Sequence, residues 1–114
     1  MPMDSVHTVK GYEQELDRLR AMMARMGGIV ESQVAQAVAA VPERDEAAAQ
    51  AAPAQDPQVD ALERDVEALS IRLLALRSPM AGDLREIVAA LKITGDLERI
   101  GDYAASIARR STRF

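Results

Sequence analysis

Residues 59–76 read VDALERDVEALSIRLLAL and carry the most regular hydrophobic pattern of the sequence. Alternating steps of three and four residues separate its apolar positions, as expected for a helix seam that packs against a partner helix. Charged residues such as Asp60, Arg64 and Glu67 lie between them, which is typical of a solvated outer face. The stretch predicts a helix over about residues 57–77, with a seam formed by Val59, Leu62, Val66, Leu69, Leu73 and Leu76.

The residues before this stretch predict a longer helix over about residues 9–41. Its apolar positions also recur every three or four residues, and they keep phase across Gly27 and Gly28. A continuous helix is therefore preferred over two shorter ones, and the glycines would let a neighbouring helix approach closely. Pro42 is expected to end this helix, and an alanine-rich segment predicts a short helix over about residues 43–52, before a bend at Asp56 that Pro53 and Pro57 bracket. The apolar positions are Tyr12, Leu16, Leu19, Met23, Met26, Val30, Val34, Val38 and Val41.

The residues after residue 77 predict a third long helix over about residues 79–111. Ser78 followed by Pro79 has the form of an N-cap residue and a proline at the first helical position. Acidic residues lie near the expected start of this helix and arginines near its end, as the helix dipole favours. Its expected interior seam comprises Met80, Leu84, Ile87, Val88, Leu91, Ile93, Leu97, Ile100, Ala104 and Ile107.

These helices predict an all-α fold. The chain has 114 residues, enough for one domain with one core, which we expect over residues 1–114. Short connections between long amphipathic helices make neighbours antiparallel. The expected architecture is therefore an antiparallel three-helix bundle with a kinked or broken middle helix.

Composition argues against several classes of function. Cysteine is absent and His7 is the only histidine, so neither a thiol nucleophile nor a serine–histidine triad is expected, and the protein is not expected to be an enzyme. A net charge of −4 with few aromatic residues argues against nucleic acid as the main partner. The sequence contains no long apolar run or signal-peptide core, so a cytoplasmic location is expected.

One acidic pair could hold a metal ion. Glu98 and Asp102 are four residues apart and would project from one face of the third helix. Their repulsion would be relieved either by a hard cation such as Mg²⁺ or Mn²⁺, or by iron, or by the nearby Arg99 or Arg85. A second acidic set on the middle helix, formed by Asp60, Glu63 and Glu67, offers similar ligands but is explained as simply by a solvated flank.

These residues resemble the PhoU family of phosphate-signalling regulators. The strings that carry the resemblance are DLERIGDY at residues 96–103 and RSPMAGDLR at residues 77–85. Weaker matches are MGGIVESQ at residues 26–33 and the opening His7-Thr8. Together they extend in the family's order over nearly the whole chain.

The resemblance implies a three-helix bundle whose E/DxxxD motif, here Glu98 and Asp102, binds iron or other metal on the helix surface. It also implies an adaptor that negatively regulates phosphate uptake and starvation signalling between a phosphate ABC transporter and a sensor histidine kinase at the inner membrane. Family members usually have two bundles in tandem, whereas this chain supplies one. It is therefore either a fragment or a bundle that pairs as a homodimer through an apolar surface to which Leu97, Ile100 or Ile107 contributes.

Two alternatives without a phosphate role stay open. One is a free-standing metal-binding helical bundle, which metal analysis would detect. The other is a coiled-coil oligomerisation module, which the seam at residues 59–76 would equally support.

Overall fold

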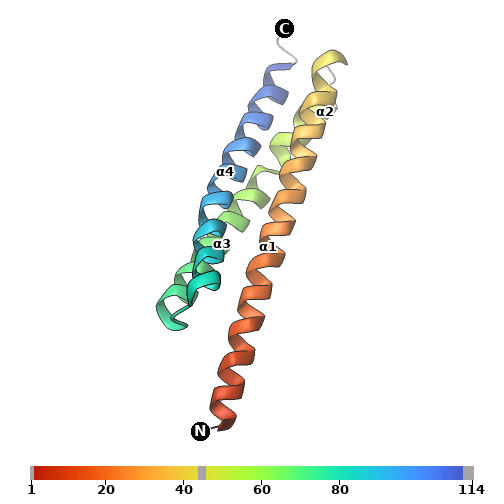
Figure 1. Cartoon of the computed structure of the whole chain (residues 1–114). Coiled ribbons are helices and arrows are strands. Elements are labelled where there is room, and N and C mark those ends of the chain that lie inside the picture. Colours follow the sequence, from red (N-terminus) through yellow and green to blue (C-terminus); the bar gives the residue numbers. More distant parts are fainter. Residues whose placement is uncertain (1, 44–45, 112–114) are drawn as a thin grey trace.

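The computed structural model describes residues 2–43 and 46–111, with side chains from residue 10 onward except those of Glu43 and Ala48. Four helices make up this part of the chain: α1 (Pro2–Glu43), α2 (Glu46–Ala54), α3 (Asp56–Leu76) and α4 (Ala81–Ser111). Figure 1 shows α2 and α3 returning along α1 as one broken leg, with α4 beside α1. The predicted three-helix bundle with a broken middle leg is confirmed.

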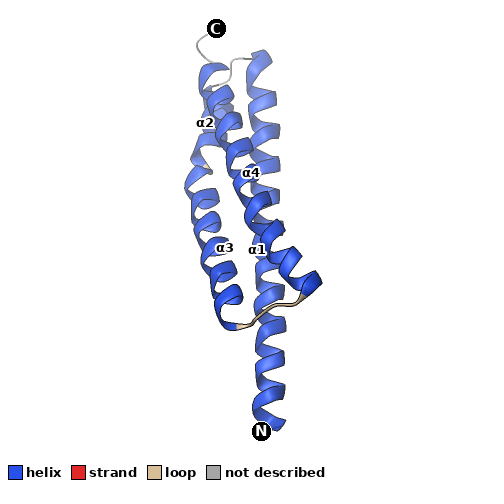
Figure 2. Cartoon of the chain, turned by 60° about the vertical axis from the view of Figure 1, so that its left-hand side comes forward, coloured by secondary structure: helices blue, strands red, loops and turns tan. Residues whose placement is uncertain are grey.

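The bundle is long and narrow, with extents of 66 × 20 × 17 Å. The α3–α4 turn lies at the end of the bundle opposite the C-terminus, and the start of α1 extends beyond this turn (Figure 2). α1 runs through Gly27 and Gly28 without a break, as the phase of its apolar residues predicted. No described atom lies within 4 Å of the Cβ position of either glycine, so the expected close approach of a neighbouring helix does not occur within this chain.

Several helix boundaries differ from those predicted, beginning with the start of α1, which lies at Pro2 and not near residue 9. Pro42 lies inside the last turn of α1, because the bond lost with its missing N–H is close to the helix end, where carbonyl groups already lack partners. The short helix that was expected at residues 43–52 spans Glu46–Ala54 and contains Pro53.

Ser78 does not cap α4. Its φ of 45° places it in the left-handed region, one residue after Arg77, the C-cap of α3, which is where helices most often carry glycine. The carbonyl of Met80 accepts hydrogen bonds from the amides of Asp83 and Leu84, so α4 starts after Met80 and not at Pro79.

The predicted seam of the middle helix is correct over five of its six positions. Val59, Leu62, Val66, Leu69 and Leu73 are buried, whereas Leu76, the last residue of α3, is 64% exposed. Large residues form the core in the half of the bundle that ends at the α3–α4 turn. There, α1 and α4 pack against this seam. The core members from α1 and α4 are Leu16, Leu19, Ile87 and Ala90, and a neighbouring cluster adds Met26 and Val30.

The core of the other half consists of small residues, which the sequence prediction missed. Beyond Val30, the buried positions of α1 are Gln33, Ala37 and Ala40, and the expected Val34, Val38 and Val41 are exposed. On α4 the buried stripe likewise runs through small residues, because α2 packs closely there. Ala37, Ala52, Ala104 and Ala108 form this cluster, whereas the predicted Met80, Leu84, Val88, Ile93, Ile100 and Ile107 are exposed.

Gln33 connects all three legs of the bundle. Its fully buried Nε2 donates hydrogen bonds to the carbonyl of Ala52 at 2.9 Å and to Oδ1 of Asp56 at 2.8 Å, on either side of the α2–α3 break. The same amide faces Gly101 on α4, where a Cβ would lie 2.6 Å from Oε1 of Gln33. The amide therefore joins the end of α2 to the start of α3 across the break, and it requires a glycine opposite.

Gly101→Ala is expected to destabilise the bundle. The added methyl group would overlap a buried amide held by two hydrogen bonds, which costs about 1–3 kcal/mol and outweighs the helix-propensity gain of roughly 1 kcal/mol. Gly95→Ala is the matched control on the same helix, since no atom lies within 4 Å of its Cβ position. Urea melts should show Gly101→Ala less stable and Gly95→Ala more stable than the parent, and equal shifts would contradict the role given to Gln33.

Candidate functional site

The two predicted acidic sets face each other across α3 and α4. Asp60 and Glu63 lie on α3, and Glu98 and Asp102 lie on α4. The charges of Asp60, Glu63 and Asp102 all act on Glu98, so the antiparallel packing of the two helices brings both sets together. The sequence had predicted each set separately but could not predict that they meet.

Among the residues of this acidic face, Glu98 has the least favourable environment for a charged carboxylate. Its side chain is half-buried, and its Oε2 is buried without a hydrogen-bond donor among the described residues. Burial, followed by the adjacent Asp60 carboxyl, raises the pKa of Glu98 to about 8, with the charges of Glu63 and Asp102 adding to the effect. The Glu98 carboxyl therefore keeps its proton to higher pH than an exposed glutamate does.

Arginine does not neutralise the predicted pair. Arg99 forms an ion pair with Asp96 at 4.0 Å, and neither it nor Arg85 pairs with Glu98 or Asp102 in the part of the chain that the structure describes. On α3, burial and then the charge of Glu67 raise the pKa of Glu63, although Arg64 acts in the opposite direction. The acidic face therefore keeps an excess of carboxyl groups.

This donor set suits a hard cation in its chemistry. Carboxylate oxygens are the ligands that Mg²⁺, Mn²⁺ and Ca²⁺ prefer, and they can also hold iron. Within residues 10–111, leaving out the side chains that are not described, no three acidic or histidine side chains converge closely enough to hold a metal ion. A cation would have to displace the proton of Glu98 and draw the side chains together.

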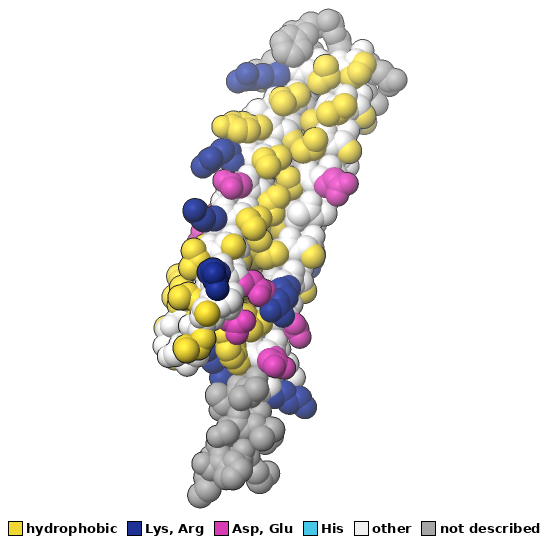
Figure 3. Space-filling model, viewed as in Figure 1, with side chains coloured by type: hydrophobic (Ala, Val, Ile, Leu, Met, Phe, Trp, Pro, Cys, Tyr) yellow, Lys and Arg dark blue, Asp and Glu magenta, His cyan; other side chains and the backbone are white. Residues whose placement is uncertain are grey.

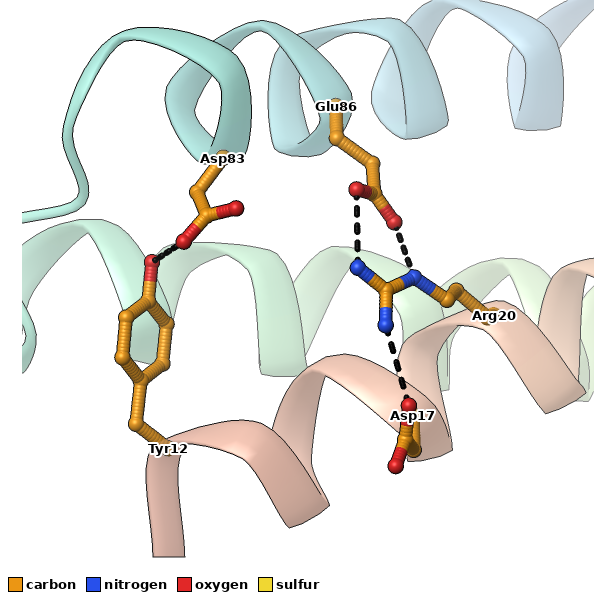
Figure 4. A network of polar contacts seen from close by, with 5 residues as sticks. All are labelled: Tyr12, Asp17, Arg20, Asp83 and Glu86. Atoms are coloured by element: carbon orange, nitrogen blue, oxygen red, sulfur yellow. Dashed lines mark hydrogen bonds and ion pairs between the residues drawn. The ribbon is translucent and has the colours of Figure 1, made fainter. Parts of the chain in front are cut away.

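The RSPMAGDLR string ties the α3–α4 turn to α1. The Arg77 guanidinium donates to Glu15 at 2.9 Å, which lowers the pKa of Glu15. Two further contacts join α1 to the start of α4 (Figure 4): Tyr12 donates its hydroxyl proton to Asp83 at 3.0 Å, and Arg20 pairs with Glu86 through two hydrogen bonds. The string therefore has a structural role that requires no ligand.

The sequence prediction missed the partners in these contacts, and it also missed the close approach of Gln33 to Gly101. Asp83 was interpreted through the helix dipole alone, and Tyr12 was assigned to the apolar seam. Gln33 and Gly101 fall within MGGIVESQ and DLERIGDY. A buried glutamine at a seam position of a helix is the signal that could have identified the first of them.

Two further expectations meet the structure only in part. The side chain of His7 lies outside those described, although its backbone belongs to α1. No helix in the described ranges is long and apolar enough to cross a bilayer.

The described residues thus form a three-helix bundle with a broken middle leg and an acidic face on α3 and α4. The chain belongs to the PhoU family, because the PhoU domain model matches residues 23–111. It is 53% identical over 105 residues to a phosphate-specific transport system accessory protein PhoU homolog of Caulobacter vibrioides, covering 92% of this chain and 46% of that protein. A homolog of the same description from Xylella fastidiosa is 50% identical over 105 residues, covering 92% of this chain and 43% of the relative.

A solved structure agrees with the fold. The crystal structure of PhoU from Pseudomonas aeruginosa matches with a TM-score of 0.86 at 41% identity, covering 90% of this chain and 49% of that one. The chain thus spans about half the length of the curated relatives it matches. The family resemblance drawn from residues 77–85 and 96–103 is confirmed.

The pKa of Glu98 predicts how stability depends on pH. Because the folded pKa of about 8 lies above the ordinary 4.5, the native state keeps a proton that the unfolded chain releases. The resulting stabilisation is full below about pH 4.5 and is lost as pH rises to about 8, a change on the order of 1–2 kcal/mol for a half-buried carboxyl. Glu98→Gln should flatten this decline in melts between pH 5 and 8, whereas Asp96→Asn on the exposed surface should leave it; a parent whose stability rises over this range would contradict the assignment.

Proposed function

We propose that the chain acts as an adaptor that negatively regulates phosphate uptake and phosphate-starvation signalling. The carrying observation is its 53% identity, over nearly its whole length, to a protein described as an accessory of phosphate-specific transport. The adaptor would couple a phosphate ABC transporter to a sensor histidine kinase, and it would be held at the cytoplasmic side of the inner membrane through these partners.

The adaptor works without covalent catalysis. The chain has no cysteine, and its one histidine lies near the start of α1. Its functional features are surfaces: an acidic face on α3 and α4, and exposed apolar residues on every long helix. Such surfaces suit binding of other proteins, because exposed apolar patches mark interaction sites.

The acidic face is proposed as a metal site. Glu98 and Asp102 would hold the cation, with Asp60 and Glu63 as further ligands, and the metal would be iron, Mn²⁺ or Mg²⁺. When bound, the cation supplies positive charge to a face crowded with carboxyl groups. The crowding of carboxyl groups supports this proposal: after burial, neighbouring carboxyl groups raise the pKa of Glu98 and Glu63, and a cation would relieve their repulsion.

A homodimer is proposed through the face between α1 and α4. Figure 3 shows hydrophobic side chains along this face, and an apolar groove there is lined by residues including Val38, Ile100 and Ile107. Leu97 is half-buried against the core and offers less to such a surface. Pairing would place two bundles side by side, and a monomer mass in sedimentation at high micromolar concentration would contradict it.

Co-purification tests the adaptor role. The tagged chain, expressed in a bacterium with a phosphate-specific transporter, should recover the transporter and the kinase from membranes of cells grown in phosphate-rich medium. In a second experiment, deletion of the gene that encodes the chain should release phosphate-starvation genes from repression. An unchanged starvation response after deletion, with no transporter recovered, would favour a free-standing bundle without a phosphate role.

Metal melts test the acidic site. Mn²⁺ or Fe²⁺ should raise the melting temperature of the parent through binding to the folded state, and the double substitution Glu98→Gln with Asp102→Asn should abolish this response. Without metal, the double variant should be at least as stable as the parent, because the repulsion is gone. A parent melting curve that is unchanged by metal would reject the site.

A further inference from the structure

The face formed by α3 and α4 is divided into an apolar half and an acidic half. On α3, Glu67, Ile71 and Leu74 continue the side that begins with Asp60 and Glu63, since steps of three and four residues keep to one side of a helix. Near the α3–α4 turn this side of α3 presents apolar residues to solvent. Ile71 is 62% exposed there, and Leu74 is 37% exposed.

The matching side of α4 repeats the division in the opposite direction along the chain. Leu84 and Val88, both exposed, lie near the turn, and Glu98 and Asp102 lie on the same side farther along. Because α3 and α4 are antiparallel, the apolar residues of both helices meet at the turn, and the acidic residues meet beyond them. Hydrophobic side chains gather at the α3–α4 turn in Figure 3.

We propose that this α3–α4 face is the docking site for an amphipathic helix of a partner protein, with an apolar stripe at one end and Lys or Arg residues at the other. The inference names the partner surface of the proposed adaptor and rests on that function. From residue 84 to residue 102 the face is about 27 Å long, which matches a partner helix of roughly 18 residues. The stripe would lie over Ile71, Leu74, Leu84 and Val88, and the basic end over the carboxyl groups.

Charge selects this occupant over the alternatives. Anionic lipid head groups would be repelled by the acidic half, so a membrane surface is disfavoured. A second copy, paired face to face through a two-fold axis, would either set carboxyl groups against carboxyl groups or place them against the apolar half. A helix with a basic end satisfies both halves at once.

Metal binding leaves room for this partner. The face carries five acidic side chains: Asp60, Glu63, Glu67, Glu98 and Asp102. One divalent cation neutralises two charges, so a negative balance persists for the basic end of the helix to meet. Glu67 lies on α3 at the border between the acidic half and the apolar half. Its charge is exposed there and acts directly on the association with the partner helix.

Model peptides with the full chain provide the test. The probe is a fluorescein-labelled helical peptide of 18 residues with leucines at steps of three and four and lysines in one half; its counterpart carries glutamates in place of the lysines. Fluorescence anisotropy at low ionic strength should show binding of the lysine peptide, weaker binding at high salt, and at least tenfold weaker binding of the glutamate peptide.

Two pairs of matched variants locate the site. Val88→Ser and Glu67→Lys should each weaken binding of the lysine peptide by about three- to tenfold. Val41→Ser and Glu31→Lys change the same residue types at exposed positions of α1, outside both proposed interfaces, and should stay within about twofold of the parent. Circular dichroism melts confirm that all four variants are folded.

Several outcomes would overturn the proposal. These are equal binding of the two peptides, equal loss in the α1 controls, attachment to phosphatidylglycerol vesicles that depends on Val88, or a dimer in sedimentation that Val88→Ser dissociates. Failure of the adaptor role can be told apart from failure of the docking surface. Peptide binding that is localised to this face, without recovery of the transporter, would support the docking surface and reject the adaptor function. Transporter recovery that survives both Val88→Ser and Glu67→Lys would keep the function and reject the surface.

Discussion

The hydrogen bonds of the Gln33 amide hold the bundle together at the point where the middle leg is interrupted between α2 and α3. The middle leg breaks between Ala54 and Asp56, and Gln33 donates to the carbonyl of Ala52 and to the carboxylate of Asp56 on either side of that break. A buried donor without an acceptor would cost more free energy than these bonds contribute, so the Nε2 group of Gln33 depends on the acceptors at the break. The small residues opposite, Gly101 above all, follow from the space that the amide occupies.

At the end of the bundle that carries the α3–α4 turn, ion pairs and one tyrosine hydrogen bond connect the helices. Glu15, Tyr12 and Arg20 on α1 reach the end of α3 and the start of α4, so the turn between those helices is attached to the longest helix of the bundle. Fixing both ends sets the register of α3 against α4. That register brings Asp60 and Glu63 opposite Glu98, where these carboxyl groups add to the effect of burial in raising the pKa of Glu98.

The exposed apolar residues separate into two faces with different neighbours. Between α1 and α4 the groove at Val34, Val38 and Ile107 is almost wholly apolar, which suits another bundle of the same kind. Between α3 and α4 the apolar residues adjoin carboxyl groups, which suits a partner that carries positive charge. An adaptor requires such separation, because it must contact different molecules through different surfaces.

The sequence by itself determined the helices, their antiparallel order, the seam from Val59 to Leu73, and the acidic pair at Glu98 and Asp102, because hydrophobic periodicity and carboxylate spacing are local properties. It did not determine which stripe of α4 is buried. Ile93, Ile100 and Ile107 have the stronger hydrophobic signal, yet Gly101, Ala104 and Ala108 face the interior, because α2 packs too closely for large side chains. Only the tertiary structure decided this, together with the meeting of Asp60 and Glu98, because both depend on how far apart two helices lie and in which register.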